Sequence, residues 1–213
     1  MGRPLRQPII VEPDTERLNQ DGKWTVEEFL AFERSSTVKH EFVDGEVYEM
    51  AGGSKNHNRI AGNLYWNLNA QLDDGSCEAF VSDVLLEVRP NLFYYPDVYV
   101  VCNSTEDNDE YIAHDPVIVA EVLSKSTKRT DRREKLEAYK RLPNLRECLL
   151  IHQDRVGIEL YSRTAPDAEW DLRIYTNLQD EIAFASIGVT VKVAEIYRRV
   201  FVAPPEKKEA ESE

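Results

Sequence analysis

Residues 94–101 read Tyr-Tyr-Pro-Asp-Val-Tyr-Val-Val, and residues 117–123 read Val-Ile-Val-Ala-Glu-Val-Leu. Each run is rich in β-branched or aromatic residues, which is typical of a buried strand, and each carries one acid, Asp97 or Glu121. A buried carboxylate is costly unless it is paired or binds a metal ion. Two acids on adjacent strands can hold a hard divalent cation, which prefers oxygen ligands. We therefore predict a metal site at Asp97 and Glu121. A salt bridge at Glu121 and a turn cap at Asp97 are the structural alternatives.

A third charged group, Lys135, follows on a helix that we predict from about residue 130 to residue 142, where Pro143 ends it. Asp131 and Tyr139 lie four residues before and after Lys135, so the three share one helix face. This face is too polar for a core stripe and could look toward the two acids. A lysine there can position water and neutralise charge developing on a phosphate. A surface pair of Asp131 and Lys135 is the alternative.

Basic residues gather directly after Glu121, although the chain has a net charge of −13 that argues against non-specific binding to a polyanion. Residues 124–146 contain nine lysines and arginines against three acids. A solvated helix face would explain such a run. Its position next to the acid pair favours contacts with nucleic-acid phosphates, for which we name Lys125, Lys128, Arg129, Arg132 and Arg133.

Two more acids, Glu41 and Glu46, bracket the turn Asp44-Gly45 of a predicted hairpin. They lie on opposite strands, and the register of pairing decides which way each side chain points. One of them is expected to complete the site with a third carboxylate.

His57 follows a glycine-rich loop, in the first turn of a helix predicted from about residue 56 to residue 72. It could contact phosphate or transfer a proton. A histidine without a role at a helix start is the alternative. The remaining histidines lack the spacing of metal ligands and are assigned no role: His40, His114 and His152.

The pattern along the chain predicts one α/β domain over residues 23–202, with a flexible arm at 1–22 and a disordered charged tail at 203–213. Thr25 and Glu28 form a capping box for a helix that ends near Glu33. A short helix is expected near residues 193–200. Strands are expected near residues 78–82, 84–88, 93–101, 117–123, 147–152, 157–161, 169–175 and 181–184.

The chain has 213 residues, and we find neither a signal peptide nor an apolar run long enough to span a membrane. The three cysteines form no CxxC pair, so we expect neither a zinc site nor a disulfide framework. Cys102 and Cys148 are predicted as small core residues. These observations favour the reducing cytoplasm.

Taken together, these residues resemble the Uma-type restriction endonucleases of the PD-(D/E)XK nuclease superfamily, over roughly residues 24–161. The matching string comprises residues 40–46 (His-Glu-Phe-Val-Asp-Gly-Glu), His57, Pro96-Asp97, residues 121–127 (Glu-Val-Leu-Ser-Lys-Ser-Thr), Asp131, Lys135 and Tyr139.

The resemblance implies a restriction-endonuclease-like core, in which helices flank a mixed central β-sheet with additional hairpins. It also implies a Mg²⁺-type site at Asp97 and Glu121. The superfamily motif acid-x-Lys reads Glu121-Val122-Leu123 in this chain. In this family the lysine is thought to come from the following helix, which maps onto Lys135.

The function expected is a Mg²⁺- or Mn²⁺-dependent DNA endonuclease acting on duplex DNA, and cutting two strands favours a homodimer. Asp97, Glu121 and Lys135 would carry catalysis, with Glu41 or Glu46 and His57 in support. A nucleic-acid-binding or regulatory protein with weak or lost catalysis is the alternative, which Leu123 and the net charge favour. A module that binds only a structural ion is a third possibility.

Overall fold

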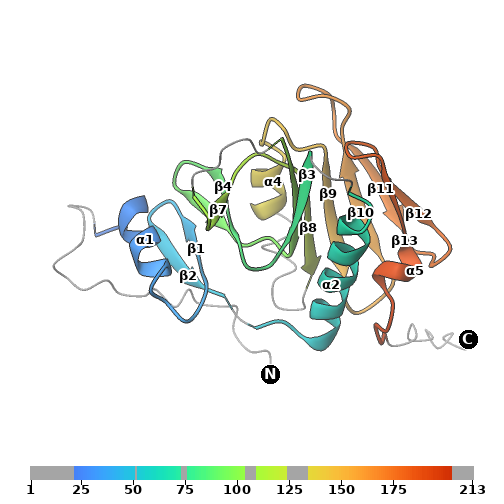
Figure 1. Ribbon diagram of the computed structural model, residues 1–213, viewed down its shortest axis with the longest axis horizontal. Coiled ribbons are helices and arrows are strands. Elements are labelled where there is room, and N and C mark those ends of the chain that lie inside the picture. Colours follow the sequence, from blue (N-terminus) through green and yellow to red (C-terminus); the bar gives the residue numbers. More distant parts are fainter. Residues whose placement is uncertain (1–21, 51, 73–75, 104–108, 124–133, 203–213) are drawn as a thin grey trace, which may run out of the picture.

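The computed structural model describes residues 22–50, 52–72, 76–103, 109–123 and 134–202 (Figure 1). Within these residues the strands form three sheets. The largest runs in the order β11 (Asp171–Tyr175), β10 (Ile158–Ser162), β9 (Glu147–His152), β8 (Pro116–Leu123), β6 (Val98–Cys102) and β3 (Cys77–Val81). The second runs in the order β2 (Glu46–Glu49), β1 (His40–Val43), β5 (Leu92–Tyr94), β4 (Leu85–Arg89) and β7 (Ile112–Ala113). β12 (Glu181–Phe184) and β13 (Val189–Lys192) pair with each other.

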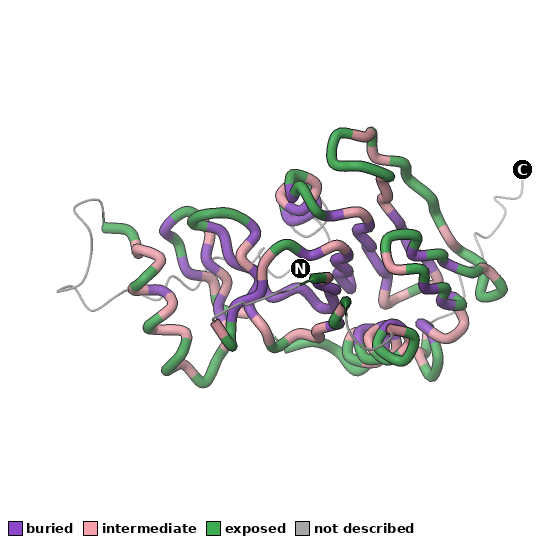
Figure 2. Tube along the Cα trace, turned by 45° about the horizontal axis from the view of Figure 1, so that its top comes forward, coloured by how far each residue is buried: buried purple, intermediate pink, exposed green. Residues whose placement is uncertain are grey.

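The six-stranded sheet is mixed, as predicted. β8 and β9 are parallel, and the other neighbours in the sheet are antiparallel. All of β9 is buried, and so is all of β8 except the partly buried Val117. Strands covered on both faces read as continuous apolar runs, which is why the sequence shows them clearly. Figure 2 shows these buried strands through the middle of the molecule.

Different elements cover the two faces of this sheet. On one face lie α2 (Lys55–Asn69), α5 (Val193–Ile196) and the β12–β13 hairpin. α2 inserts a stripe of Ile60, Leu64 and Leu68, as its spacing predicts. On the other face lie α4 (Leu136–Tyr139) and part of the five-stranded sheet. β8 alternates between these environments, because Ala120 and Val122 join the first cluster whereas Val119 and Leu123 join the second.

Local signals placed the first elements correctly. Thr25 and Glu28 form the predicted capping box of α1 (Val26–Glu33), with Thr25 N–H donating to Glu28 Oε2 over 2.7 Å. Phe29 is buried and stacks on Phe42 of β1, with ring centroids 4.9 Å apart. No helix within the described residues combines the length and hydrophobicity needed to span a bilayer.

The single strand predicted over residues 93–101 is two strands in the structure. β5 ends at Tyr94 in one sheet and β6 begins at Val98 in the other, so residues 95–97 form a corner between the sheets. Pro96 cannot donate to a strand ladder, which favours a break at this position. The apolar pattern concealed the break because both flanking strands are buried.

The expectation about the cysteines also needs correction. Cys77 and Cys102 are paired across β3 and β6 and form a disulfide, and Cys102 is only partly buried. Their separation of 25 residues gave no local signal. Cys148 is free and buried, as predicted, and burial raises the pKa of its thiol. Almost all of the predicted arm, and the tail after residue 202, lie outside the described residues, so their flexibility stays a prediction.

The turn of the β1–β2 hairpin gives a test of the fold. Asp44 and Gly45 have φ values of 50° and 92°, and a Cβ on Gly45 would lie 2.9 Å from Lys23 Cβ. We expect Gly45→Ala to lower the free energy of unfolding by about 1–2 kcal/mol, because the left-handed backbone and this contact both penalise a side chain. Urea unfolding measures the change.

Gly62→Ala is the matched control. Gly62 lies inside α2, and a Cβ there would meet nothing within 4 Å. Alanine should therefore raise the free energy of unfolding by about 0.5–1 kcal/mol. Equal effects of the two substitutions would contradict this account of the turn.

Candidate active site

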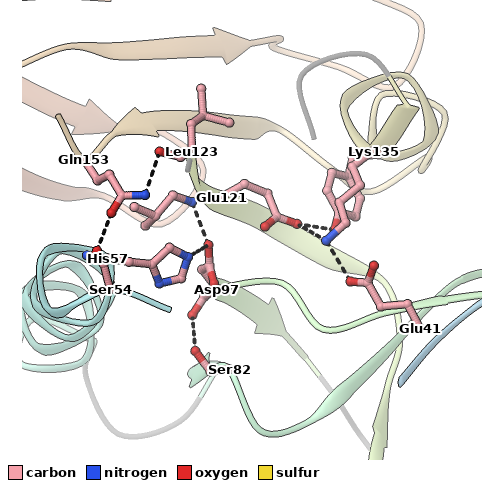
Figure 3. Close-up of polar contacts among 11 residues, drawn as sticks. Glu41, Ser54, His57, Ser82, Asp97, Glu121, Leu123, Lys135 and Gln153 are labelled. Carbon is pink, nitrogen blue, oxygen red and sulfur yellow. Dashed lines mark hydrogen bonds and ion pairs between the residues drawn. The ribbon is translucent and has the colours of Figure 1, made fainter. Parts of the chain in front are cut away.

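The corner between the sheets places Asp97 across from Glu121. β6 and β8 pair antiparallel, and their register ends with Val98 opposite Ala120, so Asp97 and Glu121 are the next residues along the two segments. The backbone N–H of Val122 donates to Asp97 Oδ2 over 2.7 Å. Ser82 N–H donates to the Asp97 carbonyl over 3.2 Å. These hydrogen bonds hold Asp97 at the end of the sheet although it lies outside any strand (Figure 3).

His57 approaches the same carboxylate from α2. Its Nε2 lies 3.1 Å from Asp97 Oδ2, and Ser54 caps the helix by accepting from His57 N–H over 3.1 Å. The loop before the helix passes so close that a Cβ on Gly53 would lie 2.9 Å from His57 Nδ1. The glycine therefore lets the loop close over the imidazole, which fixes its orientation toward Asp97.

The Glu121 side chain lies on the other face of the six-stranded sheet, the face that α4 covers. Tyr139 O–H donates to Glu121 Oε1 over 2.6 Å, and Lys135 Nζ lies 3.4 Å from the same oxygen. Lys135 Nζ also donates to Glu41 Oε1 on β1 over 2.7 Å. The ammonium thus lies between carboxylates from two sheets, as Figure 3 shows, and 5.1 Å from the centre of the Tyr94 ring.

These groups are largely removed from water, since Glu121 is 4% and Lys135 is 7% exposed. Burial and the Glu121 carboxylate raise the pKa of Tyr139 well above its usual value, so Tyr139 remains a hydrogen-bond donor. Burial and Glu41 raise the pKa of Tyr94 to about 12. Among the described residues of this cluster, the Glu41 and Glu121 carboxylates share the single Lys135 ammonium.

Asp97 and Glu121 can supply part of a metal coordination shell. Asp97 Oδ1 accepts no hydrogen bond from the described residues, which leaves it available as a ligand. Those residues contain no group of three or more histidine, cysteine or acidic side chains arranged around a metal position. This donor set suits Mg²⁺, which keeps several waters and often takes only one or two protein carboxylates together with substrate phosphates.

The structure places Glu41, and not Glu46, in contact with Lys135. In the hairpin Glu41 pairs with Tyr48, whereas Glu46 pairs with Val43 next to the turn. Glu46 is exposed and accepts a hydrogen bond from Tyr48 O–H, so the structure does not bring it to the cluster. The structure brings the predicted site residues into two groups, His57 with Asp97 and Lys135 with Glu41 and Glu121, and the Val122 N–H joins Asp97 to the strand that carries Glu121.

The side chain of Leu123, at the usual lysine position, is buried in the core between the sheet and α4. The helix predicted over 130–142 is described from Glu134 onward, with one wide turn leading into α4. The residues predicted to bind nucleic acid lie outside the described residues, so that assignment stays a prediction: Lys125, Lys128, Arg129, Arg132 and Arg133.

A hydrogen-bonded network beside Glu41 was not predicted from the sequence. Glu33 Oε2 lies 2.8 Å from His40 Nδ1, and Glu33 Oε1 accepts from Tyr95 O–H over 3.0 Å. Tyr95 N–H in turn donates to Glu41 Oε1 over 3.4 Å. His40 is thus a buried structural residue. Glu33 and Tyr95 are 62 positions apart, so no local pattern could reveal their contact.

The buried position of Lys135 gives a test that needs no substrate. We expect Lys135→Met to lower the free energy of unfolding by about 3–5 kcal/mol, because the buried Glu121 and the half-buried Glu41 lose the ammonium that they share. Adding Glu121→Gln should recover part of this loss, and a double-mutant cycle by urea unfolding measures the coupling. Arg141→Met, at an exposed position, is the control and should change stability by no more than about 0.5 kcal/mol. Additive effects of the Lys135 and Glu121 substitutions would contradict the pairing.

Comparison with known proteins gives the same family as the sequence motifs. The Uma2 family model, described as "Putative restriction endonuclease", matches residues 26–194. The uncharacterized proteins slr1290 and sll1609 of Synechocystis sp. are each 36% identical, over 83% and 78% of this chain and 92% and 94% of their own lengths. The crystal structure of a putative nuclease belonging to DUF820 from Anabaena variabilis has a TM-score of 0.66 at 16% identity, covering 82% of this chain and 97% of that one. This likeness shows a common fold. The chain belongs to the Uma2 family of restriction-endonuclease-like proteins.

Proposed function

We propose that this protein is a metal-dependent DNA endonuclease whose site is formed by Asp97, Glu121 and Lys135. The observation that carries the proposal is the hydrogen bond from Val122 N–H to Asp97 Oδ2, which places Asp97 beside the residue that follows Glu121, while Lys135 contacts Glu121. Membership in a family described as "Putative restriction endonuclease" supports the reaction class.

Asp97 and Glu121 would hold one or two Mg²⁺ or Mn²⁺ ions, with water and a substrate phosphate as the other ligands. A bound ion would supply Lewis acidity and a more acidic water. The hydrogen bond from Val122 N–H fixes Asp97 Oδ2 and leaves Oδ1 to bind the ion. His57 orients the same carboxylate from the other side.

Lys135 is proposed to orient the attacking water or to neutralise charge on the phosphate in the transition state. It takes the place of the acid-x-Lys lysine, whose position is filled by Leu123. Glu41 shares the Lys135 ammonium and would support the site directly or through water. Attack in line with the leaving oxygen would give a 5′-phosphate and a 3′-hydroxyl.

A second candidate is a nucleic-acid-binding or regulatory protein on the nuclease fold, without efficient catalysis. The net charge of −13 and the loss of lysine at Leu123 favour it. This candidate predicts salt-dependent DNA binding with no cleavage at any metal concentration.

Cleavage of supercoiled plasmid and of single-stranded DNA, with Mg²⁺ or Mn²⁺, tests the proposal. The wild-type chain should cut, and Asp97→Asn or Glu121→Ala should reduce the rate by at least about 100-fold because the metal loses a ligand. Removal of the metal with EDTA should abolish cleavage.

Glu137→Gln is the matched control, because Glu137 lies on α4 beside Lys135 but its side chain is 64% exposed. It should cut at the wild-type rate. Metal-stimulated cleavage that survives Asp97→Asn would show that the site is wrongly assigned, and binding without cleavage would support the second candidate.

A further inference from the structure

We infer that Phe201, Arg59 and Trp66 form a stacking platform for a single strand of nucleic acid that leads to the candidate active site. The inference rests on the proposed function and extends it to a substrate-binding surface. This surface is separate from the predicted phosphate contacts in residues 124–133.

The platform begins with an aromatic side chain that is fixed in an exposed position. Phe201 is 77% exposed. Its carbonyl accepts from Asn56 Nδ2 over 2.7 Å, and its N–H donates to Asn56 Oδ1 over 3.3 Å. The amide of Asn56 therefore binds both the N–H and the carbonyl of Phe201. Apolar burial does not explain this position, because the ring remains in solvent.

Arg59 and Trp66 extend the same surface along α2. The Arg59 guanidinium lies 5.4 Å from the centre of the Phe201 ring. Trp66 follows Arg59 by seven residues, close to two helical turns, so both lie on one side of the helix. Trp66 is 65% exposed, and open space remains around Gly62 between them. The rise between Arg59 and Trp66 is about 10 Å, similar to about three stacked bases.

The charge carried by α2 favours a polyanion as the occupant. Residues 51–72 contain no aspartate or glutamate, although the chain has 39 acidic residues. Lys55 and Arg59 provide positive charge on α2. Exposed aromatic rings beside cations bind unpaired bases by stacking, whereas the cations contact phosphates. A second copy of this chain, itself strongly acidic, fits this surface less well.

The surface is joined to the candidate active site through short contacts. His57, on the first turn of α2, lies 3.1 Å from Asp97. Gln153 donates to the carbonyl of Leu123, at the end of β8, and its own carbonyl accepts from Asn56 Nδ2 over 3.3 Å. A strand bound along α2 would therefore reach the end of the sheet where Asp97 and Glu121 lie.

Binding of a fluorescein-labelled single-stranded oligothymidylate, measured by anisotropy at low salt in EDTA, tests the inference without requiring cleavage. Phe201→Ala and Trp66→Ala should each weaken binding by about 5- to 100-fold, and Trp66→Phe should restore most of the affinity. Arg59→Ala should also weaken binding and flatten its salt dependence. Binding of the matching duplex should change less.

Tyr111→Ala is the matched control, because Tyr111 is 61% exposed but precedes β7 of the other sheet. It should bind like the wild type. Equal affinity of the wild type and the two alanine variants would overturn the platform and leave the proposed nuclease intact. A change in oligomeric state without a change in binding would overturn it in favour of self-association. A platform confirmed in a protein that never cuts would instead remove the nuclease proposal. No binding of the single strand by the wild type would overturn the platform, whereas the nuclease proposal is decided by the cleavage assay.

Discussion

The hydrogen bond from the Val122 N–H to the Asp97 carboxylate is the constraint on which the site depends. Asp97 lies in the corner between β5 and β6, after Pro96, where no strand ladder holds it. The bond connects this corner to β8 next to Glu121, and the β6–β8 ladder begins one residue later, with Val98 opposite Ala120. Because β8 is buried on both faces, the position of Glu121 is fixed by the core on either side of it.

This constraint determines how the charged side chains of the site are arranged. Glu121 points to the face covered by α4, where Tyr139 and Lys135 meet it. Lys135 also pairs with Glu41, so one ammonium joins the two sheets. Glu33, His40 and Tyr95 form a hydrogen-bonded network beside Glu41, to which Tyr95 N–H donates. Tyr95 is also the first residue of the corner between β5 and β6. Lys135, which directly precedes α4, contacts Glu121, whereas the side chain of Leu123 is buried in the core.

Much of the fold could be predicted because its signals are local. The Thr25–Glu28 capping box, the Asp44-Gly45 turn and the apolar stripe of α2 all depend on neighbouring residues. The break at Pro96 was missed because apolar residues continue on both sides, although the proline itself was a signal. The disulfide between Cys77 and Cys102 and the choice of Glu41 over Glu46 depend on register and on packing between distant segments. Lys135 was predicted from its helix face, but its contact with Glu41 needed the three-dimensional fold.

The central claim is that Asp97 and Glu121 hold a divalent cation together. The most direct measurement is an anomalous difference map from crystals of the full chain soaked in Mn²⁺, recorded for the wild type and for Asp97→Asn. The account predicts a peak in the wild type that contacts Asp97 Oδ1 and the Glu121 carboxylate, and its loss in the variant. A wild-type map without a peak between these two carboxylates, or a peak that persists in Asp97→Asn, would contradict it.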